Sequence, residues 1–394
     1  MTPRISSAQS ANARSYWPTC VTRRWMKRRH AMSEPSVTTV PQLRDDATVT
    51  AVLSDWLTAR DPRGSRVEVV ALRRPKGSGA SNETLLVRAL TSAQGAEPVD
   101  LVLRIAPTTM QLVLEPRFAE QYQVLDTLGR NTDIPVPKML GYEADTSLFG
   151  APFWVMSHVP GRAPADFPPY SQEGWLHDAT PEQRHRVWRS GVEALGALAA
   201  VPAGLFDFLD DPARGDGGLR QSLQYWRDAL DWASTPVNNP VLEQVYEWLV
   251  AHFPQAPITG LSWGDARIGN LLFDGGRCTA VLDWELLSLG GPLVDLAYWL
   301  MFDEMLTAGL GLTRLDGFGT REETLDLWQE TTGIELSELT WYEIFGWFRL
   351  ASVMMRGDQM RRADGRPVPG PGEFGCLSDV ADGLARRLDL STTS

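Results

Sequence analysis

The spacing of apolar and polar residues divides the chain into two parts. In the first part, short runs rich in β-branched and apolar residues predict strands, and longer segments with one apolar stripe predict helices. The predicted strands cover residues 67–72, 84–90, 100–106, 138–142 and 153–159, and the predicted helices cover residues 43–60 and about 115–129. We therefore expect a small mixed sheet accompanied by helix in this part.

Beyond Gly161, apolar residues recur at intervals near 3.6, which is the helical period. The expected helices cover residues 182–200, 219–233, 241–252, 293–306, 322–332 and 339–360, and a last helix follows a loop rich in Pro and Gly. Short strands at 271–274 and 278–284, joined by Gly275 and Gly276, interrupt this pattern. The pattern predicts an α+β protein in which a β-rich lobe (41–158) and a larger helical lobe (159–390) meet at a hinge near 156–164.

The composition is that of an ordinary globular protein, with 43% hydrophobic and 22% charged residues and no apolar run near the length of a membrane helix. The first 31 residues carry seven basic residues and no acid, so removing them from the net charge of −12 leaves −19. Such an acidic body disfavours non-specific nucleic-acid binding, and it favours either solubility or a cationic substrate. We expect no nucleic-acid or membrane partner.

The basic leader lacks the apolar core of a secretion signal. We expect residues 1–40 to be disordered or absent from the native protein, with translation starting at Met32. The three cysteines are far apart and the five histidines form no cluster, which argues against a disulfide framework or a zinc site. A cytoplasmic protein is the expectation.

The segment Trp263-Gly264-Asp265-Ala266-Arg267-Ile268-Gly269-Asn270, followed by Leu282-Asp283-Trp284-Glu285, carries the clearest chemistry. Phosphoryl transfer needs a carboxylate beside the attacking hydroxyl and oxygen ligands that hold Mg²⁺ against the phosphates. An Asp followed five positions later by Asn places both side chains on one compact turn, and a second Asp at a strand end supplies another metal ligand.

These residues resemble the aminoglycoside phosphotransferase and choline-kinase-like family, whose loop usually reads HGDxxxxN and whose metal strand reads near LDWE. The resemblance covers roughly residues 65–360. It implies a protein-kinase-like bilobal fold, with Asp265 as the catalytic base and Asn270 and Asp283 as catalytic magnesium ligands. It also implies that Asp295 braces the loop.

The resemblance further implies a nucleotide site between the lobes for ATP or GTP as co-substrate. The hairpin tip would cover the phosphates with Gly77, Ser78, Gly79, Ser81 and Asn82. The strand ending near Ser157 would provide the hinge beside adenine. Arg104 stands where many kinases have a phosphate-binding Lys, with Lys76 as the alternative cation. Its expected acidic partner is Glu120, because the family spacing falls on the neighbouring Gln121.

Arg104 and Trp263 both depart from the family pattern. Trp263 stands where the family usually has His, and its indole can fill that space and donate one hydrogen bond.

The expected function is transfer of a γ-phosphoryl group to a hydroxyl of a small molecule. Three questions stay open at this point. The sequence resembles the branch found with acyl-CoA dehydrogenases, so a hydroxyacyl-CoA or lipid hydroxyl is an alternative acceptor. A nucleotide-binding pseudokinase is an alternative to an active enzyme, and Glu285 is a secondary candidate for binding metal or substrate.

Overall fold

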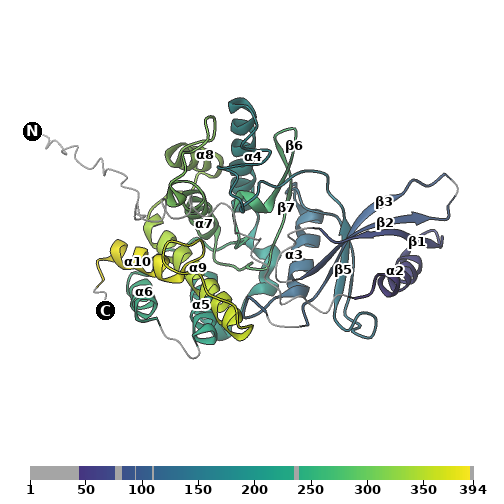
Figure 1. The fold of residues 1–394 in the computed structure, drawn as a ribbon, viewed down its shortest axis with the longest axis horizontal. Helices are drawn as coiled ribbons and strands as arrows, with labels where there is room; N and C mark the ends of the chain where they lie inside the picture. The colour runs from purple at the N-terminus through teal and green to yellow at the C-terminus, as the bar shows by residue number, and fades with distance from the viewer. Residues whose placement is uncertain (1–43, 76–81, 94, 109–110, 235–238, 391–394) are drawn as a thin grey trace, which may run out of the picture.

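The N-terminal lobe is built on one five-stranded sheet, in a computed structural model that describes residues 44–75, 82–93, 95–108, 111–234 and 239–390 (Figure 1). The strand order is β1-β2-β3-β5-β4, and every neighbouring pair is antiparallel. The expectation of a mixed sheet, with both parallel and antiparallel pairs, was therefore wrong for these five strands. The strands are β1 (Val67–Arg73), β2 (Glu83–Thr91), β3 (Val99–Ile105), β4 (Met139–Glu143) and β5 (Phe153–Ser157).

The sheet is covered on both faces, and the period-2 alternation of its strands decides which residues point to which side. On one face, Leu85, Leu103 and Phe153 pack with helix α2 (Asp46–Arg60), which lies beside the strands in Figure 1. On the other face, Val102 and Trp154 join the large core of the C-terminal lobe together with helix α3 (Phe118–Asn131). The two lobes therefore share a continuous apolar core.

Helices dominate the C-terminal lobe, as their apolar period predicts. Its main helices are α4 (Pro181–Ala199), α5 (Gly218–Ala233), α6 (Pro240–Ala251), α7 (Pro292–Met305), α8 (Arg321–Thr332), α9 (Leu339–Ala363) and α10 (Leu377–Leu388). Short 3-10 segments occupy Ala203–Leu209, Pro212–Arg214, Ile268–Asn270 and Ala308–Leu310. Helix α9 packs against α5, α6, α7 and α10, so it is the central element of this lobe.

One hairpin interrupts the helices. It consists of β6 (Leu271–Asp274) and β7 (Arg277–Val281), joined through Gly275 and Gly276, both with positive φ. Strand β7 ends at Val281, earlier than predicted, and Asp283 adopts a left-handed backbone with φ +58°. Strand alternation therefore does not relate the side chain of Glu285 to that of Asp283, because both residues lie beyond the strand.

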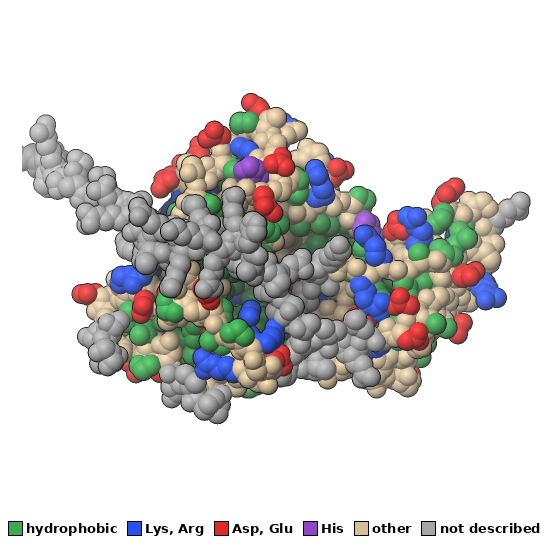
Figure 2. Space-filling view, in the orientation of Figure 1, with side chains coloured by type: hydrophobic (Ala, Val, Ile, Leu, Met, Phe, Trp, Pro, Cys, Tyr) green, Lys and Arg blue, Asp and Glu red, His purple; other side chains and the backbone are tan. Residues whose placement is uncertain are grey.

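Several expectations fall outside the described residues: the leader 1–40, and the tip residues Lys76, Gly77, Ser78, Gly79 and Ser81. Within the described residues, no single helix is long and apolar enough to cross a membrane; one bent pair, Pro181–Ala199 with Ala203–Leu209, passes on length and composition alone. On the face shown in Figure 2, acidic and basic side chains are intermixed over both lobes.

Candidate active site

The turn that carries Asp265 is held by a buried carboxylate from helix α7. Asp295 Oδ1 accepts hydrogen bonds from Ser262 Oγ and Gly264 N, both at 2.8 Å, and Asp295 Oδ2 accepts from Trp263 N at 2.7 Å. These three hydrogen bonds lower the pKa of Asp295, but burial outweighs them and raises it to about 6. Asp295 thus braces the loop, as the family resemblance implies.

Gly264 permits the sharp backbone turn just before Asp265. Its φ is +93°, and a Cβ atom built there would lie 2.0 Å from the carbonyl oxygen of Leu286. Only glycine fits this combination of a left-handed φ and a close backbone approach. The WGD sequence thus sets the direction in which Asp265 leaves the loop.

Asp265 and Asn270 lie together, as their five-residue spacing predicts. Asn270 Nδ2 donates to Asp265 Oδ2 at 2.7 Å and to the Asp265 carbonyl oxygen at 3.0 Å. Arg267 Nε donates to the same Oδ2 at 3.1 Å. Two donors therefore orient Asp265 Oδ2. Asp265 Oδ1 has no hydrogen-bond partner among the described residues.

Asp283 lies across from this turn, and its backbone is tied to the turn by Trp263. The indole Nε1 donates to the carbonyl oxygens of Leu282 at 2.8 Å and Asp283 at 3.1 Å. In addition, Leu282 N donates to the carbonyl oxygen of Asn270 at 2.9 Å. Asp283 Oδ1 is buried and has no hydrogen-bond partner among the described residues. A buried carboxylate oxygen without a hydrogen-bond partner is costly in free energy, and a bound cation would remove that cost.

Charges of both signs surround Asp265. Burial raises the pKa of Asp265 well above its usual range, and the carboxylates of Asp283 and Glu285 raise it further. Arg267 supplies a positive charge within the loop and also forms an ion pair with Asp166. Sequence reasoning missed both partners of this pair. The position of Arg267 between Asp265 and Asn270 was a signal that could have identified it. Nothing in the sequence connected Asp166 to the loop.

These residues fit a magnesium ion. The oxygens of Asp283 and the side-chain oxygen of Asn270 are hard ligands, and Mg²⁺ commonly takes only one or two protein ligands beside phosphates and water. Within the part of the chain that the structure describes, no group of three or more His, Cys, Asp or Glu residues could hold a metal ion. A site completed by nucleotide phosphates is consistent with both observations.

The candidates for nucleotide binding lie on the sheet lobe. Arg104 lies on the same face as Val102, with its guanidinium 5.3 Å from the ring centroid of Trp154, and its buried Nε has no partner among the described residues. The structure shows no ion pair between Arg104 and Glu120 in the described residues. Gln121, at the family spacing, is buried and donates to the Pro116 carbonyl at 2.6 Å. Neither side chain of the 120–121 pair therefore holds Arg104.

The remaining two candidates differ in how much of their hydrogen-bonding capacity is already used. Asn82 is buried beside strand β2, and its Oδ1 has no partner among the described residues. Ser157 ends strand β5, and its hydroxyl accepts a hydrogen bond from Lys138 N at 2.9 Å. Asn82 thus retains an acceptor for a ligand, whereas the hydroxyl of Ser157 is engaged with the backbone before β4.

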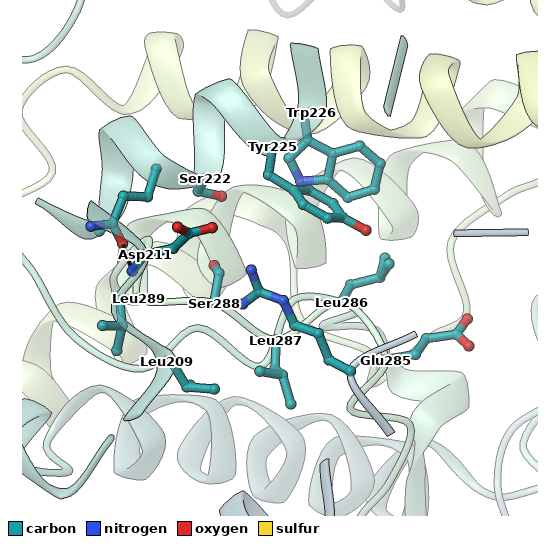
Figure 3. Close-up of a pocket in the computed structure, with 13 residues that line it drawn as sticks. Leu209, Asp211, Ser222, Tyr225, Trp226, Glu285, Leu286, Leu287, Ser288 and Leu289 are labelled. Atoms are coloured by element: carbon teal, nitrogen blue, oxygen red, sulfur yellow. Dashed lines mark hydrogen bonds between the residues drawn. The ribbon is translucent and has the colours of Figure 1, made fainter. Parts of the chain in front are cut away.

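A pocket that is open to solvent and has about 410 Å³ of empty space lies beside Glu285. Figure 3 shows Tyr225 and Trp226 of α5 on one side, leucines on the opposite side and Glu285 at one end. Its walls also include Arg117, Leu209, Asp211, Gly218, Gln221, Ser222, Leu286, Leu287, Ser288 and Leu289. The cavity combines a mainly apolar surface with polar groups at its edges.

Comparison with protein families and curated proteins supports one relationship. A family model described as the phosphotransferase enzyme family matches residues 73–330. Mouse acyl-CoA dehydrogenase family member 10 is 30% identical over 287 residues, covering 70% of this chain and 25% of the mouse protein. Human acyl-CoA dehydrogenase family member 11 is 27% identical over 296 residues, covering 70% of this chain and 36% of the human protein. The chain thus spans well under half the length of these relatives, and they confirm the predicted branch.

Solved structures confirm the predicted bilobal, protein-kinase-like fold. A candidate aminoglycoside phosphotransferase from Ralstonia eutropha shares 24% identity with a TM-score of 0.63, over 87% of this chain and 99% of that one. Macrolide 2′-phosphotransferase from Brachybacterium faecium shares 21% with a TM-score of 0.50, over 84% and 97%. A thermostable mutant of an aminoglycoside phosphotransferase, solved with AMP-PNP and hygromycin B, shares 15% with a TM-score of 0.51, over 85% and 98%.

Proposed function

This chain belongs to the phosphotransferase enzyme family, and from that premise we propose that it transfers the γ-phosphoryl group of ATP or GTP to a hydroxyl of a small molecule. The observation that carries the proposal is the state of the Asp265 carboxylate. Two donors orient its Oδ2, and its Oδ1 has no protein partner among the described residues. A general base needs this combination of a fixed orientation and one available oxygen.

In the proposed reaction, the acceptor hydroxyl donates a hydrogen bond to Asp265 Oδ1. As its oxygen forms a bond to the γ-phosphorus, the bond from that phosphorus to the β-phosphate oxygen breaks, and the hydroxyl proton passes to Asp265. The nucleoside diphosphate leaves with the electron pair of the broken bond. Positioning and charge stabilisation account for most of the catalysis in such transfers, so the rigid loop is the main contribution of the protein.

The proposed magnesium ligands are Asn270 and Asp283. Asn270 Nδ2 is held by Asp265, which turns its side-chain oxygen away from that contact. Magnesium, when bound, neutralises charge on the β- and γ-phosphates. We propose that Arg104 and Asn82 contact the nucleotide from the sheet lobe, together with the hairpin tip, and that Ser157 and Glu120 lie at the edges of that site.

A hydroxylated acyl chain is a second candidate acceptor. The cavity beside Glu285 has leucines 209, 286, 287 and 289 and Trp226 in its walls, and these favour an amphipathic ligand over a highly polar one. The curated relatives named above are acyl-CoA dehydrogenase family members, which points in the same direction. A cationic acceptor would instead be favoured by the acidic charge of the chain.

Calorimetric titration of ATP and GTP, with and without Mg²⁺, tests the nucleotide site. We expect Asp283→Ala to lose the magnesium-dependent part of binding. Asp274→Ala is the matched control, because Asp274 is an exposed acid at the end of β6. If well-folded wild type binds neither nucleotide, the proposed function is wrong.

An ADP-release assay over a panel of hydroxylated acceptors then tests catalysis and separates the two acceptor classes. We expect Asp265→Ala to abolish transfer while nucleotide affinity stays within about twofold, because the proposed role of Asp265 is on the acceptor side. Wild type that binds magnesium and nucleotide yet transfers phosphate to no acceptor class would favour the pseudokinase alternative.

A further inference from the structure

Arg349 is a fully buried arginine in the middle of helix α9, and its surroundings are largely aromatic. Its side chain is 1% exposed. The guanidinium carbon lies 4.6 Å from the ring centroid of Tyr298, 5.2 Å from that of Trp226 and 5.8 Å from that of Phe345. Stacking on rings makes the burial of a guanidinium tolerable, but a buried charge is costly unless its hydrogen bonds are satisfied.

The hydrogen bonding of this guanidinium is directed at the catalytic loop. Arg349 Nη2 donates to the carbonyl oxygen of Gly264 at 2.6 Å, across 85 residues of sequence. Its Nε and Nη1 are buried and have no partner among the described residues. The core of this lobe therefore contains a buried positive charge whose hydrogen-bond donors are only partly used. The hydrogen bond that Arg349 Nη2 does form fixes a backbone carbonyl.

That carbonyl belongs to the peptide group that links Gly264 to Asp265. The preceding peptide group is also fixed, because Gly264 N donates to Asp295 Oδ1 at 2.8 Å. The left-handed turn at Gly264 is thus held at its N–H by α7 and at its carbonyl by α9. Fixing both peptide groups fixes the position from which the Asp265 side chain starts.

The charge of Arg349 also acts on this turn. It attracts the carboxylates of both Asp265 and Asp295, and the partly buried Arg267 is a second cation beside Asp265. Asp283 and Glu285 add further negative charge to the same region. A cation behind the loop therefore offsets repulsion that would push these carboxylates apart.

We propose that Arg349 is a positioning residue for phosphoryl transfer: from helix α9 it holds the Gly264 carbonyl and thereby fixes the turn that presents Asp265 to the acceptor. This inference rests on the proposed function. It predicts that Arg349 affects turnover rather than nucleotide affinity, because Arg349 contacts the acceptor-side turn and not the sheet lobe.

The test uses hydrolysis of MgATP by the full chain, with water as the acceptor, in wild type and two variants. Arg349→Met keeps the length and apolar packing of the side chain but removes the donors and the charge. Arg349→Lys keeps the charge and a donor with altered geometry. We expect kcat to fall by about 100-fold in Arg349→Met and by about tenfold in Arg349→Lys, while KM for MgATP changes less than about twofold.

Arg314→Met is the matched control. Arg314 is a partly buried arginine that also holds a backbone carbonyl, that of Gly319 at 2.7 Å, and it forms an ion pair with Asp303. Thermal unfolding of all variants measures stability separately from turnover. We expect Arg314→Met to lose stability and to keep the wild-type kcat, which would separate positioning from a general effect of losing a buried arginine.

A folded Arg349→Met variant with the wild-type kcat would overturn the inference, and so would a rise in KM without a fall in kcat. If Arg349→Met does not fold, a wild-type kcat in Arg349→Lys overturns it instead. Wild type that neither binds nor hydrolyses MgATP would remove the proposed function and this inference together, whereas active wild type with active Arg349 variants removes the inference alone.

Discussion

Trp263→Phe tests whether the indole, standing where the family usually has His, supports Asp283. The substitution keeps an aromatic ring in a position that is 1% exposed, and it removes the donor shared by the carbonyls of Leu282 and Asp283. A buried acceptor that loses its donor costs about 1–3 kcal/mol. The smaller ring adds a cavity cost, which must be separated from the hydrogen bond.

Trp328→Phe provides that separation. Trp328 is 0% exposed in helix α8, and its Nε1 has no hydrogen-bond partner among the described residues. Both substitutions remove the same atoms from a buried site, but only Trp263→Phe removes a hydrogen bond. We therefore expect the free energy of unfolding to fall more in Trp263→Phe than in Trp328→Phe, by about 1–3 kcal/mol.

Urea denaturation followed by circular dichroism measures this difference, because the chain has 15 tryptophans and fluorescence would mix their signals. The functional consequence is measured by calorimetric titration of MgATP. We expect affinity to fall about tenfold in Trp263→Phe, which corresponds to about 1.4 kcal/mol, and to stay unchanged in Trp328→Phe. Equal stability losses together with equal affinities in the two variants would refute the reasoning.

Three further predictions follow from the same loop and its surroundings. Gly264→Ala should lower the free energy of unfolding by more than about 2 kcal/mol, because the added methyl clashes with Leu286. Gly357→Ala in α9 should raise the free energy of unfolding by about 0.5–1 kcal/mol, because the added methyl meets no neighbouring atom. Urea denaturation of the two variants measures both changes. Burial raises the pKa of Asp295 to about 6, above its unfolded value of 3.8, so the folded state holds that proton more tightly and this contribution to stability is lost as pH rises through about 6. The stability of wild type relative to Asp295→Asn should therefore fall by up to about 3 kcal/mol from about pH 4 to about pH 7, and a difference that does not vary with pH would contradict the assignment. Burial raises the pKa of Cys278 to about 12, so maleimide labelling at about pH 8, mapped by mass spectrometry, should be about 1000-fold slower at this thiol in native than in urea-unfolded protein.

The periodicity of the sequence determined the local elements with good accuracy. Alternation located the strands of the sheet lobe, and a period near 3.6 located the helices from α4 to α9, because burial of one face imposes these periods on the residues themselves. The five-residue spacing of Asp265 and Asn270 likewise predicted a contact within one turn, and the structure shows that contact.

The apolar pattern did not predict where strand β7 ends. The pattern from 278 to 284 continues to look like a strand, yet the chain turns left-handed at Asp283. The bonds from Leu282 N to Asn270 and from Trp263 to Asp283 hold the turn, and both join residues far apart in sequence. Periodicity reports which side of a local element is buried, and it is silent on hydrogen bonds that cross between elements.

The same limit applies to the supports of the site. The sequence by itself determined which residues could perform the chemistry, because a carboxylate and an amide at close spacing are chemically recognisable. Only the tertiary structure decided that Arg349 meets Gly264, that Arg267 pairs with Asp166, and that α5 closes a cavity beside Glu285. These contacts depend on how helices pack across the lobe, and packing is determined by the whole chain rather than by any local pattern.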